Sequence, residues 1–154
     1  MSNQIVKSLT MLTLVVGLVL AAAVVSANGQ SSSMSVTADI PFDFIVADKT
    51  LPSGKYTVRE AALNGLSIRS DDGKSSVIRL GNLAEEKTKK RNARLVFHRY
   101  GQQYFLAEVW SGETYGRQLM KCDRERHARK EWIASKSDSG KGSYEIVEIV
   151  AQIR

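Results

Sequence analysis

The sequence holds a single cysteine, Cys122, among its 154 residues. A lone cysteine cannot form an intrachain disulfide, so stability must come from packing even in an oxidising compartment. There are only two histidines, His98 and His127, and they do not form the closely spaced pair that zinc sites use. Cys122 and His127 lie five residues apart (127 − 122), which misses the i, i+4 spacing of one helix face. The sequence therefore predicts no metal site and no cofactor.

Motifs of nucleophilic catalysis and of phosphate binding are missing too. The chain has no Gly-x-Ser-x-Gly segment and no glycine-rich phosphate loop. Basic neighbours would lower the thiol pKa of Cys122, but this residue stands where a helix is expected to begin. Asp39 and Asp43 share one face of an expected strand, roughly 13 Å apart, which is beyond the spacing of glycosidase carboxylates. We therefore expect a non-enzymatic protein, with a hydrolase as the weakest alternative.

What the sequence does contain is an export signal over residues 1–27. Lys7 precedes residues 9–25, an uncharged and mostly apolar run, and Val25-Ser26-Ala27 then provides the small residues that signal peptidase needs. The alternative is an uncleaved anchor in the inner membrane, because this run is at the short end of the spanning range. No Lys/Arg stop-transfer cluster follows it. We expect a cleaved signal and a periplasmic or extracellular protein.

Cleavage after Ala27 would leave residues 28–33 as a polar linker and residues 34–154 as one β-rich domain. Lys7 is the only charged side chain removed, so 22 − 1 = 21 basic and 16 acidic side chains remain. A basic surface favours anionic partners, such as an envelope polymer or lipid headgroups, and export argues against nucleic acid. Membrane contact is otherwise expected only through an uncleaved signal segment.

The expected fold is mainly β, a small antiparallel sandwich or partly open barrel of about seven strands with one helix near the C-terminus. The first strand contains Pro41, which predicts an edge strand or a bend. The last strand also fits helical spacing, although its β-branched residues favour a strand. Residues 48–54 and 81–92 are expected to be connections. The expected strands are residues 34–46, 55–60, 66–70, 75–80, 94–100, 104–110 and 144–153.

The expected helix covers residues 123–135, with Asp123 as its N-cap and no Gly or Pro inside. The hairpin of residues 94–110 is apolar on both faces, so its second face needs a cover. We expect Ala128 and Trp132 to dock there, and His98 to form a hydrogen bond beneath the helix. The basic residues of the helix would then face solvent.

Two basic runs, one before the central hairpin and one on the helix, are the candidate anion-binding residues. Aromatic side chains that could stack on a ligand lie nearby, whereas interleaved acids favour a merely solvated surface. An alternative function is a carrier of small apolar ligands inside a barrel, suggested by Tyr100, Leu106 and Trp110. The candidate anion-binding residues are Lys87, Lys89, Lys90, Arg91, Arg94, Arg124, Arg126, Arg129 and Lys130.

Two pairs of segments carry a resemblance. The first pair is IPFDFIV (residues 40–46) with LPSGKYTV (51–58), and the second is LVFHRYG (95–101) with YFLAEVW (104–110). Together they resemble a group of small predicted exported bacterial proteins with no established activity, over most of residues 36–135. Separately, Leu-Pro-x-Gly-x-Tyr-x-Val is similar to the turn-into-strand segment of prealbumin-like sandwich modules. Neither resemblance implies a catalytic residue.

Overall fold

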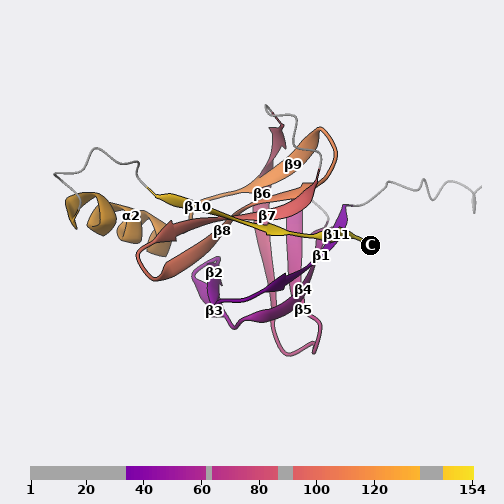
Figure 1. Cartoon of the computed structure of the whole chain (residues 1–154), viewed down its shortest axis with the longest axis horizontal. Helices are drawn as coiled ribbons and strands as arrows, with labels where there is room; N and C mark the ends of the chain where they lie inside the picture. Colours follow the sequence, from indigo (N-terminus) through magenta and orange to yellow (C-terminus); the bar gives the residue numbers. More distant parts are fainter. Residues whose placement is uncertain (1–33, 62–63, 87–91, 136–143) are drawn as a thin grey trace, which may run out of the picture. The chain divides into compact units, whose positions relative to one another are not determined.

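The computed structural model describes residues 34–61, 64–86, 92–135 and 144–154 (Figure 1). The expected signal peptide and linker, residues 1–33, lie outside this part of the chain. The described residues are mainly β, with eleven strands and one helix, α2 (Asp123–Ser135), which confirms the expected class and the helix near the C-terminus. The expected number of seven strands was too low.

The strands form one sheet with the order β10-β7-β8-β9-β6-β5-β4-β1-β11. β2 and β3 form a hairpin that is not part of this order. β2 joins the sheet through one parallel pairing, between Ile45 and Phe105 of β8. The bounds are β1 (Ser35–Ile40), β2 (Phe44–Val46), β3 (Lys49–Leu51), β4 (Gly54–Ala61), β5 (Gly65–Ser70), β6 (Ser76–Glu85), β7 (Ala93–Tyr100), β8 (Gln103–Ser111), β9 (Tyr115–Leu119), β10 (Glu145–Val150) and β11 (Gln152–Ile153).

The structure has more strands than expected for two reasons. Some expected strands are interrupted, and some segments expected to be loops pair with neighbouring strands. The expected first strand is broken at Pro41, between β1 and β2, because proline cannot donate to the ladder. β1 is not an edge strand, since it pairs with both β4 and β11. Residues 81–85 belong to β6 rather than to a loop, because they pair with β9, and the connection of residues 48–54 contains β3.

The C-terminal segment supplies both ends of the strand order. β10 pairs with β7, β11 pairs with β1, and only Ala151 lies between them. The Ala151 N–H donates to the Ala93 carbonyl at 2.8 Å, and the Arg154 N–H donates to the Ser35 carbonyl at 3.0 Å. The strand interpretation of residues 144–153 is thus confirmed. β10 and β11 do not pair with each other, so the sheet is not closed.

The main core gathers inward side chains from strands at both ends of the order. Phe97 of β7 is fully buried and meets the rings of Phe42 and Phe44 edge-on, with centroids 5.2 and 5.6 Å away. Tyr56 of β4 meets Phe44 in the same way at 5.0 Å. Side chains of β1, β4 and β5 therefore pack against those of β7 and β8, and the sheet folds over its own apolar face.

Helix α2 covers part of the second face of the β7–β8 hairpin, as expected. Ala128 is buried and Trp132 is half-buried, and both pack in a second apolar cluster with Tyr100 and Phe105. The basic residues of the helix stay exposed. The docking arises because one turn of helix separates Ala128 from Trp132, so both face the hairpin.

The second face of the β7–β8 hairpin is also covered by side chains that contact Trp110. The Trp110 indole N–H donates to Glu108 Oε2 at 2.8 Å, and the Arg94 guanidinium lies 4.9 Å above the ring. Arg94 is ion-paired with Glu86, and both side chains are buried. Gly116 of β9 lies against the ring, where a Cβ would come within 2.5 Å of the Trp110 ring carbon Cε3. These contacts bury Trp110 between β7 and β9.

Candidate anion-binding site

The outer face of β4 and β5 is polar because both strands alternate strictly. Tyr56 and Val58 of β4 point into the core, which turns Thr57 and Arg59 outward. On β5 the buried Leu66 and Ile68 likewise leave Ser67 and Arg69 outside. Two adjacent strands thus present hydroxyl and guanidinium groups on one surface.

The strand register brings three arginines onto this surface. Arg59 is paired with Ser67 and Thr57 with Arg69, so Arg59 and Arg69 are diagonal neighbours with Cβ atoms about 7 Å apart. Arg154 reaches the same region from the end of β11, where its N–H is bonded to Ser35 in β1. Arg59 and Arg69 are 10 residues apart in the chain (69 − 59), and Arg154 lies 85 residues after Arg69 (154 − 69).

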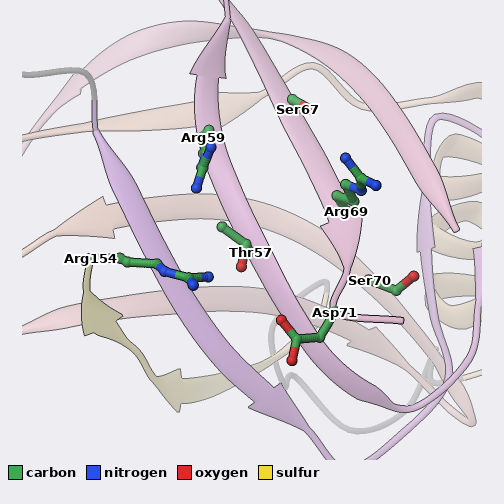
Figure 2. Close-up of a pocket in the computed structure, with 7 residues that line it drawn as sticks. All are labelled: Thr57, Arg59, Ser67, Arg69, Ser70, Asp71 and Arg154. Atoms are coloured by element: carbon green, nitrogen blue, oxygen red, sulfur yellow. The ribbon is translucent and has the colours of Figure 1, made fainter. Parts of the chain in front are cut away.

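These arginines line a cavity of about 280 Å³. Figure 2 shows the side chains of Arg59 and Arg154 on either side of Thr57, with Arg69 on the neighbouring strand. The rest of the lining is polar, and one residue of it, Asp71, is acidic. The lining residues are Thr57, Arg59, Ser67, Arg69, Ser70, Asp71 and Arg154.

These three arginines form no ion pair among the described residues, and Asp71 is the single acid in the lining of their cavity. Arg59, Arg69 and Arg154 are exposed, and none forms an ion pair or a side-chain hydrogen bond with another described residue. Arg94 and Arg117, by contrast, are ion-paired with Glu86 and Glu60. Since guanidinium groups bind carboxylate, phosphate or sulfate through two parallel hydrogen bonds, the cavity has the chemistry of an anion site.

Thr57 adds a hydroxyl group to the cavity. Its Oγ1 lies 3.3 Å from Oγ1 of Thr37 on β1, so one of the two hydroxyls donates to the other. The pair then retains a second hydroxyl hydrogen that can be donated to a ligand. When Thr37 donates within the pair, the Thr57 hydroxyl is a neutral donor between Arg59 and Arg154 that can bind an oxyanion.

The sequence candidates for anion binding lie elsewhere. Lys87, Lys89, Lys90 and Arg91 fall outside the described residues, and Arg94 is inside the fold beside Trp110. On α2, Arg124 donates to Thr50 Oγ1 at 2.9 Å and Arg126 is ion-paired with Asp123, whereas Arg129 and Lys130 are exposed. The structure does not bring the described candidates together in one cavity.

The sequence interpretation missed Arg59, Arg69 and Arg154. The signal that could have found the first two is their position opposite buried residues in two neighbouring strands. Arg154 carried no such signal, because its place depends on the pairing of β11 with β1.

A buried polar network lies beneath α2. His98 Nδ1 lies 2.9 Å from Glu125 Oε1, and the Tyr100 hydroxyl donates to the same oxygen at 3.2 Å. All three side chains are buried, and the Tyr144 ring lies 4.0 Å from the imidazole. Burial, together with the Glu125 carboxylate, raises the pKa of Tyr100. The expected hydrogen bond of His98 under the helix is confirmed.

Cys122 directly precedes the first residue of α2. The side chain is buried, and burial raises the pKa of its thiol. Neither His98 nor His127 is hydrogen-bonded to it within the part of the chain that the structure describes. Among those residues no three His, Cys, Asp or Glu side chains are placed to hold a metal ion.

No helix in the described ranges is long and apolar enough to cross a membrane. Comparisons with protein-family models, curated proteins and solved structures give no match to this chain.

Proposed function

We propose that this chain is an exported, non-enzymatic binding domain of the cell envelope that holds an anionic ligand in the arginine-lined cavity. The observation that carries the proposal is the group of three exposed guanidiniums without protein partners around one concave surface. Arginines that stabilise a fold are usually paired, as Arg94 and Arg117 are here. Unpaired arginines that converge on a cavity are typical of recognition of anions.

The lining of the cavity supports binding rather than catalysis. It consists of arginine, serine, threonine and one aspartate, and it contains no histidine or cysteine that could serve as base or nucleophile. The buried His98–Glu125 pair is enclosed beneath α2, away from this surface. Guanidinium and hydroxyl donors provide affinity for an anion without any chemical step.

We infer a partly open barrel as the architecture of this domain. Its support is the C-terminal segment, which pairs with β7 through β10 and with β1 through β11. A rigid sheet of this kind holds the outer-face arginines at fixed spacing, which lowers the entropy lost on ligand binding.

Binding is tested by titrating the mature protein with galacturonate and with inorganic phosphate at low salt, using calorimetry and backbone amide shifts. We expect shifts confined to β4, β5 and β11. Arg59→Gln should weaken binding about tenfold or more, because a hydrogen bond to a charged group contributes about 1.5–3 kcal/mol. Arg129→Gln, which removes the same charge from α2, is the matched control. Weakening by Arg129→Gln alone would place the site on the helix instead.

Export is tested by the mass of the protein purified from its own host. We expect the mature N-terminus at Asn28 or within a few residues of it, because Val25-Ser26-Ala27 fits signal peptidase. A membrane-bound form that retains residues 1–25 would contradict cleavage and support the anchor. Lys7 would then keep the N-terminus inside, so residues 34–154 would still face outward.

A further inference from the structure

The arginine-lined cavity shares lining residues with two others, one on the same outer face and one at the adjoining end of β4 and β5. One, of about 280 Å³, adds Lys55 and Gln152 to Arg154. The other, of about 680 Å³, extends past Lys55 to Lys74 in the turn after β5. Asp71 lines all three cavities. We call the three cavities together the outer-face track; its basic residues are Lys55, Arg59, Arg69, Lys74 and Arg154, and its acidic residues are Asp71 and Asp72.

The track is longer than a single anion. Lys55 and Arg59 are four residues apart on β4, which is about 13 Å at the rise of a strand. Across the sheet, the track passes from β11 over β1 and β4 to β5, three strand spacings or about 14 Å. A chain of several charged units is needed to contact all of it.

The basic side chains of the track outnumber the acidic ones that line it, five to two. Lys74 is paired with Asp72 at 3.6 Å, and Lys55 lies across from Asp39 on β1. Lys55 and the three arginines have no ion pair within the described part of the chain. Four cations therefore face the solvent from one concave surface.

Asp71 indicates what kind of polyanion fits. Its carboxylate stands where the three cavities join and can only accept hydrogen bonds when ionised. A polyphosphate offers only acceptors and further negative charge at that point, so Asp71 would repel it. A sugar acid offers hydroxyl donors to Asp71 and a carboxylate to the arginines. Hydroxyl and amide groups that can bond to a sugar line the rest of the track: Thr37, Thr57, Ser67, Ser70, Ser75 and Gln152.

We propose that the outer-face track binds a linear acidic polysaccharide, with uronate carboxylates on the arginines and sugar hydroxyls on Asp71. This inference rests on the proposed function and names the ligand class of the same site. Successive sugar units contact successive cavities, so affinity grows with chain length until the track is filled.

The test compares mono-, tri- and hexagalacturonate with a neutral hexasaccharide and a short polyphosphate, each titrated by calorimetry at two salt concentrations. We expect hexagalacturonate to bind at least tenfold more tightly than the monomer and more tightly than polyphosphate. The neutral sugar should bind poorly, and added salt should weaken the acidic ones. Equal affinity of monomer and hexamer would overturn the polysaccharide inference and leave the proposed function standing. Failure of every anion to bind would overturn both.

Asp71→Asn is the decisive variant. The backbone N–H of Asp71 donates to the Lys55 carbonyl, and this bond does not depend on the side chain, so the hairpin should remain intact. Asp71→Asn should weaken hexagalacturonate severalfold and strengthen polyphosphate. Glu131→Gln, the same change on the exposed face of α2, should alter neither. Equal strengthening of both ligands by Asp71→Asn would show that Asp71 only repels, and would overturn its role in recognising sugar hydroxyls.

Discussion

Glu125→Ala is expected to lower the free energy of unfolding by about 2–6 kcal/mol, because two buried groups lose their hydrogen-bond partner at about 1–3 kcal/mol each. The carboxylate is only 4% exposed, and one of its oxygens contacts both His98 and Tyr100. Without it, an imidazole nitrogen and a phenol lose their acceptor in a place that water does not reach. The loss should also loosen α2, which reaches the hairpin through this network.

Denaturant unfolding followed by circular dichroism measures this effect. Glu131→Ala on the exposed face of the same helix is the matched control and should change stability by less than about 0.5 kcal/mol. Glu125→Gln keeps the shape and one acceptor oxygen, so its cost should be intermediate. If Glu125→Ala and Glu131→Ala had equally small effects, the network would not contribute to stability.

Gly116→Ala is expected to cost up to about 3 kcal/mol, the upper part of the range for overpacked interiors. The new Cβ would lie 2.5 and 2.6 Å from two ring carbons of Trp110, and 2.8 Å from the Val109 carbonyl oxygen. The ring cannot move aside easily, because Glu108 holds its N–H and Arg94 covers its other side. The backbone of β9 must therefore shift.

A double-mutant cycle with Trp110→Leu separates the steric cause from a general preference for glycine. Leucine does not place ring carbons over β9, so Gly116→Ala should cost clearly less in the Trp110→Leu background. Denaturation midpoints of the four proteins supply the measurement. An unchanged cost would show that contact with the Val109 carbonyl, rather than the indole, makes glycine necessary.

The parts of the fold that could be predicted are those with a strong local pattern. The hairpin of β7 and β8 has long apolar runs around Gly101, and α2 has no helix breaker, so both were expected within a residue or two. The expected N-cap was wrong: Asp123 is the first helical residue and is paired with Arg126, and the Arg124 N–H donates to Asp48 Oδ1 instead. β9 was missed because Tyr115-Gly116-Arg117-Gln118-Leu119 has no β-branched residue and no clear alternation. It is a strand because β6 and β8 flank it and pair with it.

The candidate site could not be predicted for a related reason. The sequence interpretation looked for cations that are contiguous in the chain, and the described members of those runs are paired, buried or spread over α2. Arg59 and Arg69 become neighbours only through the register of β4 with β5. Arg154 joins them only because β11 pairs with β1, a contact that no local pattern reveals.

The hydrogen bond between the Arg154 N–H and the Ser35 carbonyl also affects how the chain folds. Closing a loop of 119 residues (154 − 35) costs about 4 kcal/mol of chain entropy by the logarithmic scaling of loop closure. Such non-local pairing slows folding, and until residues 145–154 have paired, β7 and β1 each present an open edge. One short segment therefore covers the edges of two strands that lie far apart in the sheet order, and its removal would uncover both of them at once.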